Sequence, residues 1–439
     1  MNSKKYVWHP YTQMREWKNF DVITKGEGMW LIDVKGNKLL DGVASMWCNV
    51  WGHSKKELVN AMIKQTKKLQ HSSLFNLTND QAELLSEKIV KISPGMDKVF
   101  YSDDGSTAME IAVKMALQYW QNMGIKNKSK IVSLKNGYHG DTTGAMSLGY
   151  VPLFFSRFKK ILFPVIRAPT PEKYRMPAGF TFEEYQKFCI EKIENIFSKN
   201  NDIAAFFMES GAQVAGGVVI YPTGFQSKIS KLCKKYNILF VLDEIATGFG
   251  RLGSLIEYQT QNSRPDIVSY GKMLTGGYLP LAATLTSKGI YESFLGRYDE
   301  MKHFLHGHTF TGNPIACATA ITNLELYEKN KLISEVQKRS KQFESRISEI
   351  NELNRVGDVR HRGMLMGIEL VSNKKKKISI KPEKLVYKKI FDEAKKHKIY
   401  LRTLGNIVML VPPLAISKNE LDFLLDGTID TIKKITKAI

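Results

Sequence analysis

The sequence predicts an α/β protein with a mostly parallel sheet between helices, joined to a smaller α+β domain. The chain has 439 residues, of which 43% are hydrophobic, so it can bury a large core. From about Met96 to Met273, short apolar runs alternate with segments of helical period, which is the pattern of helices packed on a parallel sheet. Further along, the chain becomes rich in lysine and helical before two more strand candidates, which indicates the smaller domain.

The N-terminal residues are expected to belong with the C-terminal ones. Residues 1–55 include the hairpin-like stretch GMWLIDVKGNKLLDG but are too few to fold alone. We therefore predict an N-terminal segment, 1–55, that packs with a C-terminal small domain, 326–439. The large domain between them is predicted to span 56–325.

The strands of the large domain are predicted from apolar runs that end in polar or glycine-rich residues. Phe225, Ile229 and Cys233 recur at helical spacing and precede the expected buried strand Ile238 to Leu242. The other expected strands are Lys98 to Ser102, Lys130 to Leu134, Ala204 to Met208 and Asp266 to Tyr270. A helix from Pro314 to about Glu328 precedes the small domain, whose strand candidates are Met364 to Val371 and Ile407 to Val411.

The composition argues against several classes of protein. Lysine and arginine number 64 against 43 acidic residues, a net charge of +21, which raises nucleic acid as a partner. Apart from Lys374 to Lys377 the surplus is spread along the chain, and no nucleic-acid motif accompanies it, so we expect no nucleic-acid binding. The four cysteines are far apart and lack metal-binding spacing, and we predict neither a metal site nor disulfides.

No targeting or membrane segment is expected. The start MNSKKYVWHPYTQM becomes polar and aromatic too early for a signal peptide. No apolar run reaches the roughly 18 residues that a membrane span requires. We therefore expect a cytoplasmic location.

The first chemical signal is a helix start that follows a strand. Ligands of open α/β sheets bind beyond the carboxyl ends of the strands. Gly105 and Ser106 begin the helix after the first of these strands, where free N–H groups and the helix dipole favour a phosphate. Thr107 and Glu110 fit a capping box for this helix. A capped helix without a ligand is the alternative for this motif taken alone.

Asp243 and Lys272 follow two later strands and are candidates for the same site. A carboxylate at the end of a buried strand requires a positive partner, and a protonated pyridine nitrogen is one, with a salt bridge or a metal as alternatives. A partly desolvated lysine has a lowered pKa, and its neutral amine can form a Schiff base with an aldehyde. A lysine that extends into solvent is the alternative for Lys272.

A phosphate cradle, an acid and a lysine are together the anchors that pyridoxal 5'-phosphate (PLP) requires from a protein. A fourth element fits, since NGYHGDT follows another strand and could place Tyr138 or His139 against the cofactor ring. The stretch TGFGRLG has the glycine spacing of a dinucleotide site, but no suitably spaced acidic residue ends a second strand. We therefore expect PLP rather than NAD.

The chain resembles the class III family of fold-type I, PLP-dependent aminotransferases over nearly its whole length. The motifs that carry the resemblance are DGST (104–107), NGYHGDT (136–142), LDEIATGFGR (242–251), GKMLTGG (271–277) and HGHTFTGNP (306–314). WHPYTQM, MALQYWQNMG and DEIATGFGR are similar to the branch of this family in biotin biosynthesis. The resemblance implies conversion of 8-amino-7-oxononanoate to 7,8-diaminononanoate by a ping-pong mechanism.

The resemblance also implies how the cofactor is held. Lys272 would form the Schiff base and act as the base, Asp243 would pair with the ring nitrogen, and Tyr138 would stack on the ring. Gly105 and Ser106 would hold the phosphate. His308 and Thr309 would reach the phosphate of a neighbouring subunit, which implies a homodimer with shared sites. Glu209 and Arg251 match family positions that support the active site.

The substrate contacts implied by the resemblance are Tyr11, Trp47, Asp141, Gly307 and Arg402, of which Arg402 would pair with the far carboxylate. The amino donor stays open between S-adenosylmethionine and L-lysine. Met46 and Met409 differ from residues typical of members that use S-adenosylmethionine, and Ser210 with MWCNVWGH and YGKMLTGGYLP is closer to lysine users. Another class III ω-amino-acid aminotransferase is the alternative, because fold and cofactor do not fix the substrate.

Overall fold

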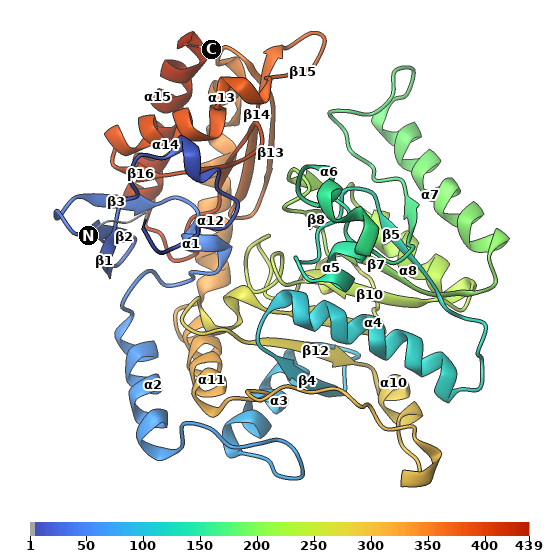
Figure 1. Ribbon diagram of the computed structural model, residues 1–439. Coiled ribbons are helices and arrows are strands. Elements are labelled where there is room, and N and C mark those ends of the chain that lie inside the picture. Colours follow the sequence, from blue (N-terminus) through green and yellow to red (C-terminus); the bar gives the residue numbers. More distant parts are fainter. Residues whose placement is uncertain (1–4, 439) are drawn as a thin grey trace.

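The computed structural model describes residues 5–438 and is built around a mostly parallel main sheet (Figure 1). The strand order is β4-β12-β11-β10-β7-β5-β6, and β12 runs antiparallel to both neighbours. Each strand predicted for this sheet is present within one residue of its expected ends, and the predicted fold class is confirmed. The strands are β4 (Lys98–Ser102), β5 (Lys130–Leu134), β6 (Ile166–Ala168), β7 (Ile203–Glu209), β10 (Leu239–Asp243), β11 (Ile267–Tyr270) and β12 (Ala282–Thr286).

Helices cover both faces of the main sheet, because successive side chains of a strand point to opposite faces. Phe207 packs in the apolar cluster that includes α4 (Gly105–Asn122). Its neighbour Phe206 packs in the cluster that includes α7 (Phe182–Lys199) and α8 (Phe225–Lys235). The unbroken apolar runs of β7 and β10 follow from this double burial.

The N-terminal strands share a sheet with the C-terminal region. β2 (Trp30–Asp33) and β3 (Lys38–Asp41) form the predicted hairpin, and β1 (Ile23–Glu27) pairs with β2. β3 then pairs in parallel with β16 (Ile399–Tyr400). In Figure 1 this sheet lies beside α14 (Val386–Lys396) and α15 (Lys418–Ala438). The domain boundaries at 55 and 325 stay a prediction.

A second antiparallel sheet forms most of the C-terminal region. Its order is β13-β14-β18-β17, with β15 paired to β14. The predicted end of β14 at Val371 is two residues short, because the strand continues to Asn373 in its pairing with β15. The strands are β13 (Val356–Arg362), β14 (Leu365–Asn373), β15 (Ile378–Ser379), β17 (Arg402–Leu404) and β18 (Ile407–Leu410).

The remaining elements connect these sheets. The predicted helix at Pro314 is α11 (Pro314–Lys329), whose first N–H groups bond to the Asn313 side chain. No helix among residues 5–438 has both the length and the apolarity to cross a bilayer. The other helices and short strands are α1 (Ala44–Trp47), α2 (Lys56–Lys68), α3 (Asp80–Ile92), α5 (Thr143–Leu148), α6 (Pro152–Phe155), α9 (Glu257–Thr260), α10 (Lys288–Ser293), α12 (Leu332–Ser345), α13 (Ile347–Glu352), β8 (Ala212–Gln213) and β9 (Val219–Ile220).

Candidate active site

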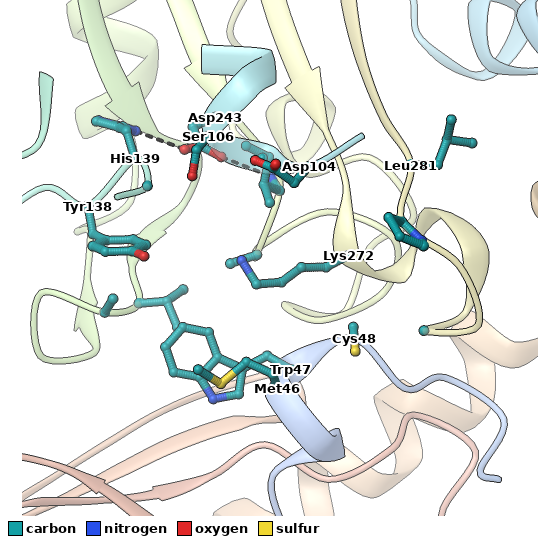
Figure 2. Close-up of a pocket in the computed structure, with 18 of the residues that line it drawn as sticks. Met46, Trp47, Cys48, Asp104, Ser106, Tyr138, His139, Asp243, Lys272 and Leu281 are labelled. Atoms are coloured by element: carbon teal, nitrogen blue, oxygen red, sulfur yellow. Dashed lines mark hydrogen bonds and ion pairs between the residues drawn. The ribbon is translucent and has the colours of Figure 1, made fainter. Parts of the chain in front are cut away.

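A cavity of about 450 Å³ lies at the carboxyl ends of the main-sheet strands, where open α/β sheets bind ligands. Residues that end or follow β4, β5, β7, β10 and β11 line it, together with residues 46–48 from the N-terminal region (Figure 2). The cavity therefore collects residues that are far apart in the chain. The predicted residues that line it are Trp47, Gly105, Ser106, Tyr138, Glu209, Asp243 and Lys272.

Lys272 presents its amine to this cavity. It begins a short 3₁₀ helix (Lys272–Thr275) directly after β11, with a φ of 43°, which is strained for a residue with a β-carbon. Its amine has no hydrogen bond or ion pair within residues 5–438 and lies 5.7 Å from the centroid of the Trp47 ring. Burial lowers the pKa of Lys272, with the Asp243 charge opposing this shift. A lowered pKa favours the neutral, nucleophilic form.

Asp243 is the last residue of β10 and is only 4% exposed. Its Oδ1 accepts a hydrogen bond from Ile245 N (2.9 Å), and its Oδ2 accepts one from His139 Nδ1 (2.8 Å). Because a carboxylate only accepts, the His139 proton lies on Nδ1. The sequence offered His139 as one of two candidates for the ring face, but the structure pairs it with Asp243. The sequence signal for this pair is that both residues follow strands at one sheet edge.

Glu209 ends β7 directly beside Asp243 in the sheet register. It accepts hydrogen bonds from Val214 N (2.9 Å) and Tyr138 N (3.2 Å). Burial, followed by the nearby Asp243 charge, raises the pKa of Glu209 to about 8. Glu209 is therefore mostly protonated at neutral pH.

The start of α4 forms the candidate anion cradle, and its cap differs from the prediction. Asp104 is the N-cap, since its Oδ1 accepts from Thr107 N (3.0 Å) and Asp104 N donates to Thr107 Oγ1 (3.2 Å). The capping box expected between Thr107 and Glu110 is therefore wrong, because the helix begins earlier than that pair requires. Glu110 instead accepts from Gly144 N (2.7 Å) at the start of α5.

Gly105 lets the α4 start approach the segment that follows β10. A β-carbon at Gly105 would lie 2.8 Å from Ile245 Cγ2, closer than such atoms pack. Ser106 Oγ accepts from Asp141 N (3.2 Å), which ties the cradle to the loop that carries Tyr138. Gly105 and Ser106 at the start of α4 thus line the cavity with Asp243 and Lys272, and a helix terminus there attracts an anion.

A carboxylate bridges two tyrosines near the cavity. Asp141 accepts hydrogen bonds from Tyr138 OH (3.0 Å) and Tyr11 OH (2.5 Å). Burial is the main cause that raises the pKa of both tyrosines, so they stay protonated and donate. The structure thus brings three predicted residues together, although only Tyr138 lines the cavity itself.

Trp47 and Arg402 lie at the side of the cavity that the N-terminal and C-terminal regions form. Trp47 is 8% exposed and forms part of the wall under the Lys272 amine. Arg402, on β17, does not line the cavity, but its Nη1 lies 2.6 Å from the Sδ of Met46, which does. The guanidinium is therefore next to the cavity wall.

Gly307, His308 and Thr309 lie outside the cavity of their own chain. His308 Nδ1 is 3.4 Å from Asp103 Oδ2 without hydrogen-bond geometry, and neither ring nitrogen has a hydrogen-bond partner among the described residues. Gly307 and Thr309 are exposed. Arg251 is also outside the cavity, fully buried, and donates to Met364 O (2.9 Å) and Pro412 O (2.8 Å).

Comparison with known proteins places these features in a family. The model of the class III aminotransferase family matches residues 12–432. An adenosylmethionine-8-amino-7-oxononanoate aminotransferase from Geobacter sulfurreducens is 43% identical over 438 residues, covering 99% of this chain and 97% of the relative. One of the same name from Methanocaldococcus jannaschii is 43% identical, covering 98% and 97%.

Solved structures agree with the sequence relatives. The crystal structure of the Methanocaldococcus jannaschii protein is similar at a TM-score of 0.92 and 42% identity, covering 98% of each chain. An omega transaminase from Pseudomonas jessenii, solved in complex with PMP, has a TM-score of 0.94 at 29% identity, covering 100% of this chain and 98% of that one.

Proposed function

This chain belongs to the class III aminotransferases, and from that premise we propose that it aminates 8-amino-7-oxononanoate to 7,8-diaminononanoate. The observation that carries the proposal is the buried amine of Lys272, which has no hydrogen bond or ion pair among the described residues and shares one cavity with Asp243 and the start of α4. The names of relatives at 43% identity over nearly the whole chain support the choice of acceptor.

Enzymes of this family use PLP, and the cavity fits that group. Gly105 and Ser106 line the cavity at the α4 start, where a helix terminus attracts a phosphate, and a β-carbon at Gly105 would meet Ile245. Asp243 is a buried carboxylate whose partners are a peptide N–H and His139, so a cationic nitrogen can still pair with it. Lys272 offers the amine that an aldehyde requires.

Each residue then has a distinct task. When bound, PLP supplies an aldehyde for the transferred amine and a ring that withdraws electrons from the reacting carbon. Gly105 and Ser106 bind the phosphate, Tyr138 covers the ring, and Asp243, oriented by His139, stabilises a protonated ring nitrogen. Lys272 Nζ removes the proton from the carbon that bears the donor's amine, because its lowered pKa leaves it free to accept one.

The acceptor carries an amine at one end and a carboxylate at the other, and the residues near the cavity match both. Asp141, held between Tyr11 and Tyr138, provides a negative charge for the ammonium group. Arg402 provides the bidentate donor that a carboxylate favours. Trp47 forms the apolar wall that suits the methylene chain between them. Gly307 would complete the substrate site from a second subunit.

A donor panel tests this function and its donor. We propose S-adenosylmethionine, the donor in the relatives' names, and L-lysine is the competitor that Met46, Ser210 and Met409 favour. The experiment incubates the holoenzyme with 8-amino-7-oxononanoate and each donor, and detects 7,8-diaminononanoate by mass spectrometry. If product forms with L-lysine but not with S-adenosylmethionine, L-lysine is the donor. No product with either donor, beside turnover of another ω-amine, would assign a different class III reaction.

A second copy of the chain is proposed to complete the site. Phe75, Leu77, Leu305 and Phe310 are large apolar side chains that are 61%, 67%, 66% and 55% exposed, and Phe75 lies against Gly307. Neither ring nitrogen of His308, in the same segment, has a hydrogen-bond partner among the described residues. In a homodimer this surface would be buried, and His308 and Thr309 would reach the partner's phosphate site.

A further inference from the structure

The wall of the cavity opposite the anion cradle is a strained turn. Residues 44–47 (α1) form one nominal helical turn, but Ala44, Ser45 and Trp47 have φ of 48°, 57° and 65°. Ser45, with ψ of −70°, has the rare γ-turn conformation, which residues with a β-carbon avoid. Such conformations persist only where surrounding interactions enforce them.

The buried carboxylate of Asp41 is what enforces this turn. Asp41 is fully buried at the end of β3. Its Oδ2 accepts from Ser45 N (2.7 Å) and Ser45 Oγ (2.9 Å), and its Oδ1 accepts from Val43 N (3.3 Å). His53 Nε2 lies 3.3 Å from Oδ2. A buried carboxylate requires such partners, so Asp41 and the turn depend on each other.

The turn determines which side chains line the cavity on this side. Met46, Trp47 and Cys48 follow Ser45 directly and line the cavity. In Figure 2, Met46 and Trp47 lie across Lys272 from Asp243 and Ser106, so they are on the side away from the anion cradle. Arg402 Nη1 contacts Met46 Sδ, which makes the turn the support of the guanidinium as well.

From this arrangement we propose that Asp41 is a positioning residue for substrate. Through Ser45 it holds the strained turn that places Met46, Trp47 and Arg402 around the substrate. Cofactor binding does not depend on it, because the cradle and Asp243 lie on the other side of Lys272. The proposal rests on the proposed function for the identity of the substrate, but any amine and ketone that the wild type turns over can test it.

Asp41→Asn tests the proposal with little change in size. An amide offers one acceptor oxygen instead of two, so a turn N–H loses its partner. We expect the substrate KM to rise about tenfold or more, as for loss of one charge-assisted hydrogen bond, while the Kd for PLP changes less than about twofold. Asp33→Asn is the matched control, because Asp33 Oδ1 also accepts turn N–H groups, from Lys35 (2.8 Å) and Asn37 (2.9 Å), but no residue of that turn lines the cavity.

Relief of strain provides the decisive comparison. Glycine adopts positive φ without strain, so Ser45→Gly in the Asp41→Asn background should restore much of the lost KM. If Asp41→Asn fails to fold, Ser45→Ala, which removes only the hydroxyl contact, should raise KM in the same direction. An unchanged KM, an equal loss of PLP affinity, or no recovery with Ser45→Gly would each overturn the proposal. The wild-type donor panel decides the proposed function separately.

Discussion

At the scale of single residues, the chemistry of this site follows from two buried groups with opposite requirements. Lys272 is held where burial lowers its pKa, which favours the neutral amine. The carboxylate of Asp243 accepts hydrogen bonds from Ile245 N and His139 Nδ1. The amine and the carboxylate in one cavity match the two groups of PLP that a protein must bind, its aldehyde and its cationic ring nitrogen.

His139 should matter through Asp243. His139→Ala removes the 2.8 Å hydrogen bond and leaves a buried carboxylate with one partner fewer. The cost of about 1–3 kcal/mol for such a loss predicts a fall in kcat of roughly 10- to 100-fold. His139→Asn, which can keep an N–H donor, should retain more activity. Steady-state kinetics of the two variants checks this, and equal activity of His139→Ala and wild type would contradict it.

At the scale of elements, strands deliver the charged groups and one helix start provides the anion cradle. The cradle depends on close approach, because a β-carbon at Gly105 would lie 2.8 Å from Ile245 Cγ2 and 2.9 Å from Ile245 Cδ1. Gly105→Ala must therefore shift the helix start or the segment after β10.

We expect Gly105→Ala to weaken PLP binding about tenfold or more, since a displaced helix start loses aligned N–H donors. Gly289→Ala is the matched control, because it lies in α10 and a β-carbon there meets nothing within 4 Å. Titration of the cofactor-free proteins with PLP, followed by absorbance, provides the comparison. Equal PLP affinity of the two variants would show that the start of α4 does not bind the phosphate.

Glu244 links β10 to α9 and should make stability depend on pH. It accepts from Glu257 N (2.9 Å) and Tyr258 N (2.5 Å), and burial raises its pKa from 4.5 to about 8, as burial does for Glu209. Between these values the folded state binds more protons than the unfolded state. The free energy of unfolding of the cofactor-free protein should therefore fall as pH rises through this window, by up to about 1.4 kcal/mol per pH unit for each group.

Urea denaturation from pH 5 to 8 measures this slope. Glu244→Gln cannot ionise, so its slope should be shallower than that of the wild type by the contribution of one group. A wild-type slope in the Glu244→Gln variant would show that Glu244 is ionised in the folded state across this range.

At the scale of the whole molecule, shared sites in a homodimer can be tested by mixing two defective chains. Lys272→Ala lacks the reactive amine, and Thr309→Ala lacks the proposed phosphate contact. If Thr309 acts across the interface, a mixed dimer contains one site with both residues intact. Co-refolded mixtures should then regain up to about a quarter of wild-type activity, assuming random pairing into dimers with one intact site in half of them. A mixture no more active than its parents would place Thr309 in its own subunit's site or remove it from the reaction.

The sequence predicts the strands and the main site residues of this molecule better than it predicts their tertiary contacts. Strands such as Lys98–Ser102 were predicted at their observed ends because apolar runs with polar termini are local signals. The rule that ligands bind at the carboxyl ends of strands brought Asp243, Lys272 and Gly105 to one cavity. These three residues could be assigned to one site because each ends or closely follows a strand of the same sheet.

Other features depend on tertiary distances that no local pattern contains. The His139–Asp243 bond joins residues on two different strand ends, and the true cap of α4 depends on where the helix begins. The Asp41 turn was missed because no local pattern shows that the Asp41 carboxylate holds residues 44–47 at strained backbone angles. Residues 307–309 were predicted from motif resemblance alone, and one chain does not bring them into its cavity.

The role of Lys272 is tested most directly by locating the residue to which the cofactor is attached. Holoenzyme is reduced with borohydride, digested, and analysed by peptide mass spectrometry. We expect a retained B6 adduct on the peptide that contains Lys272 and on no other lysine. An adduct on another residue, or complete release of the cofactor after reduction, would contradict it.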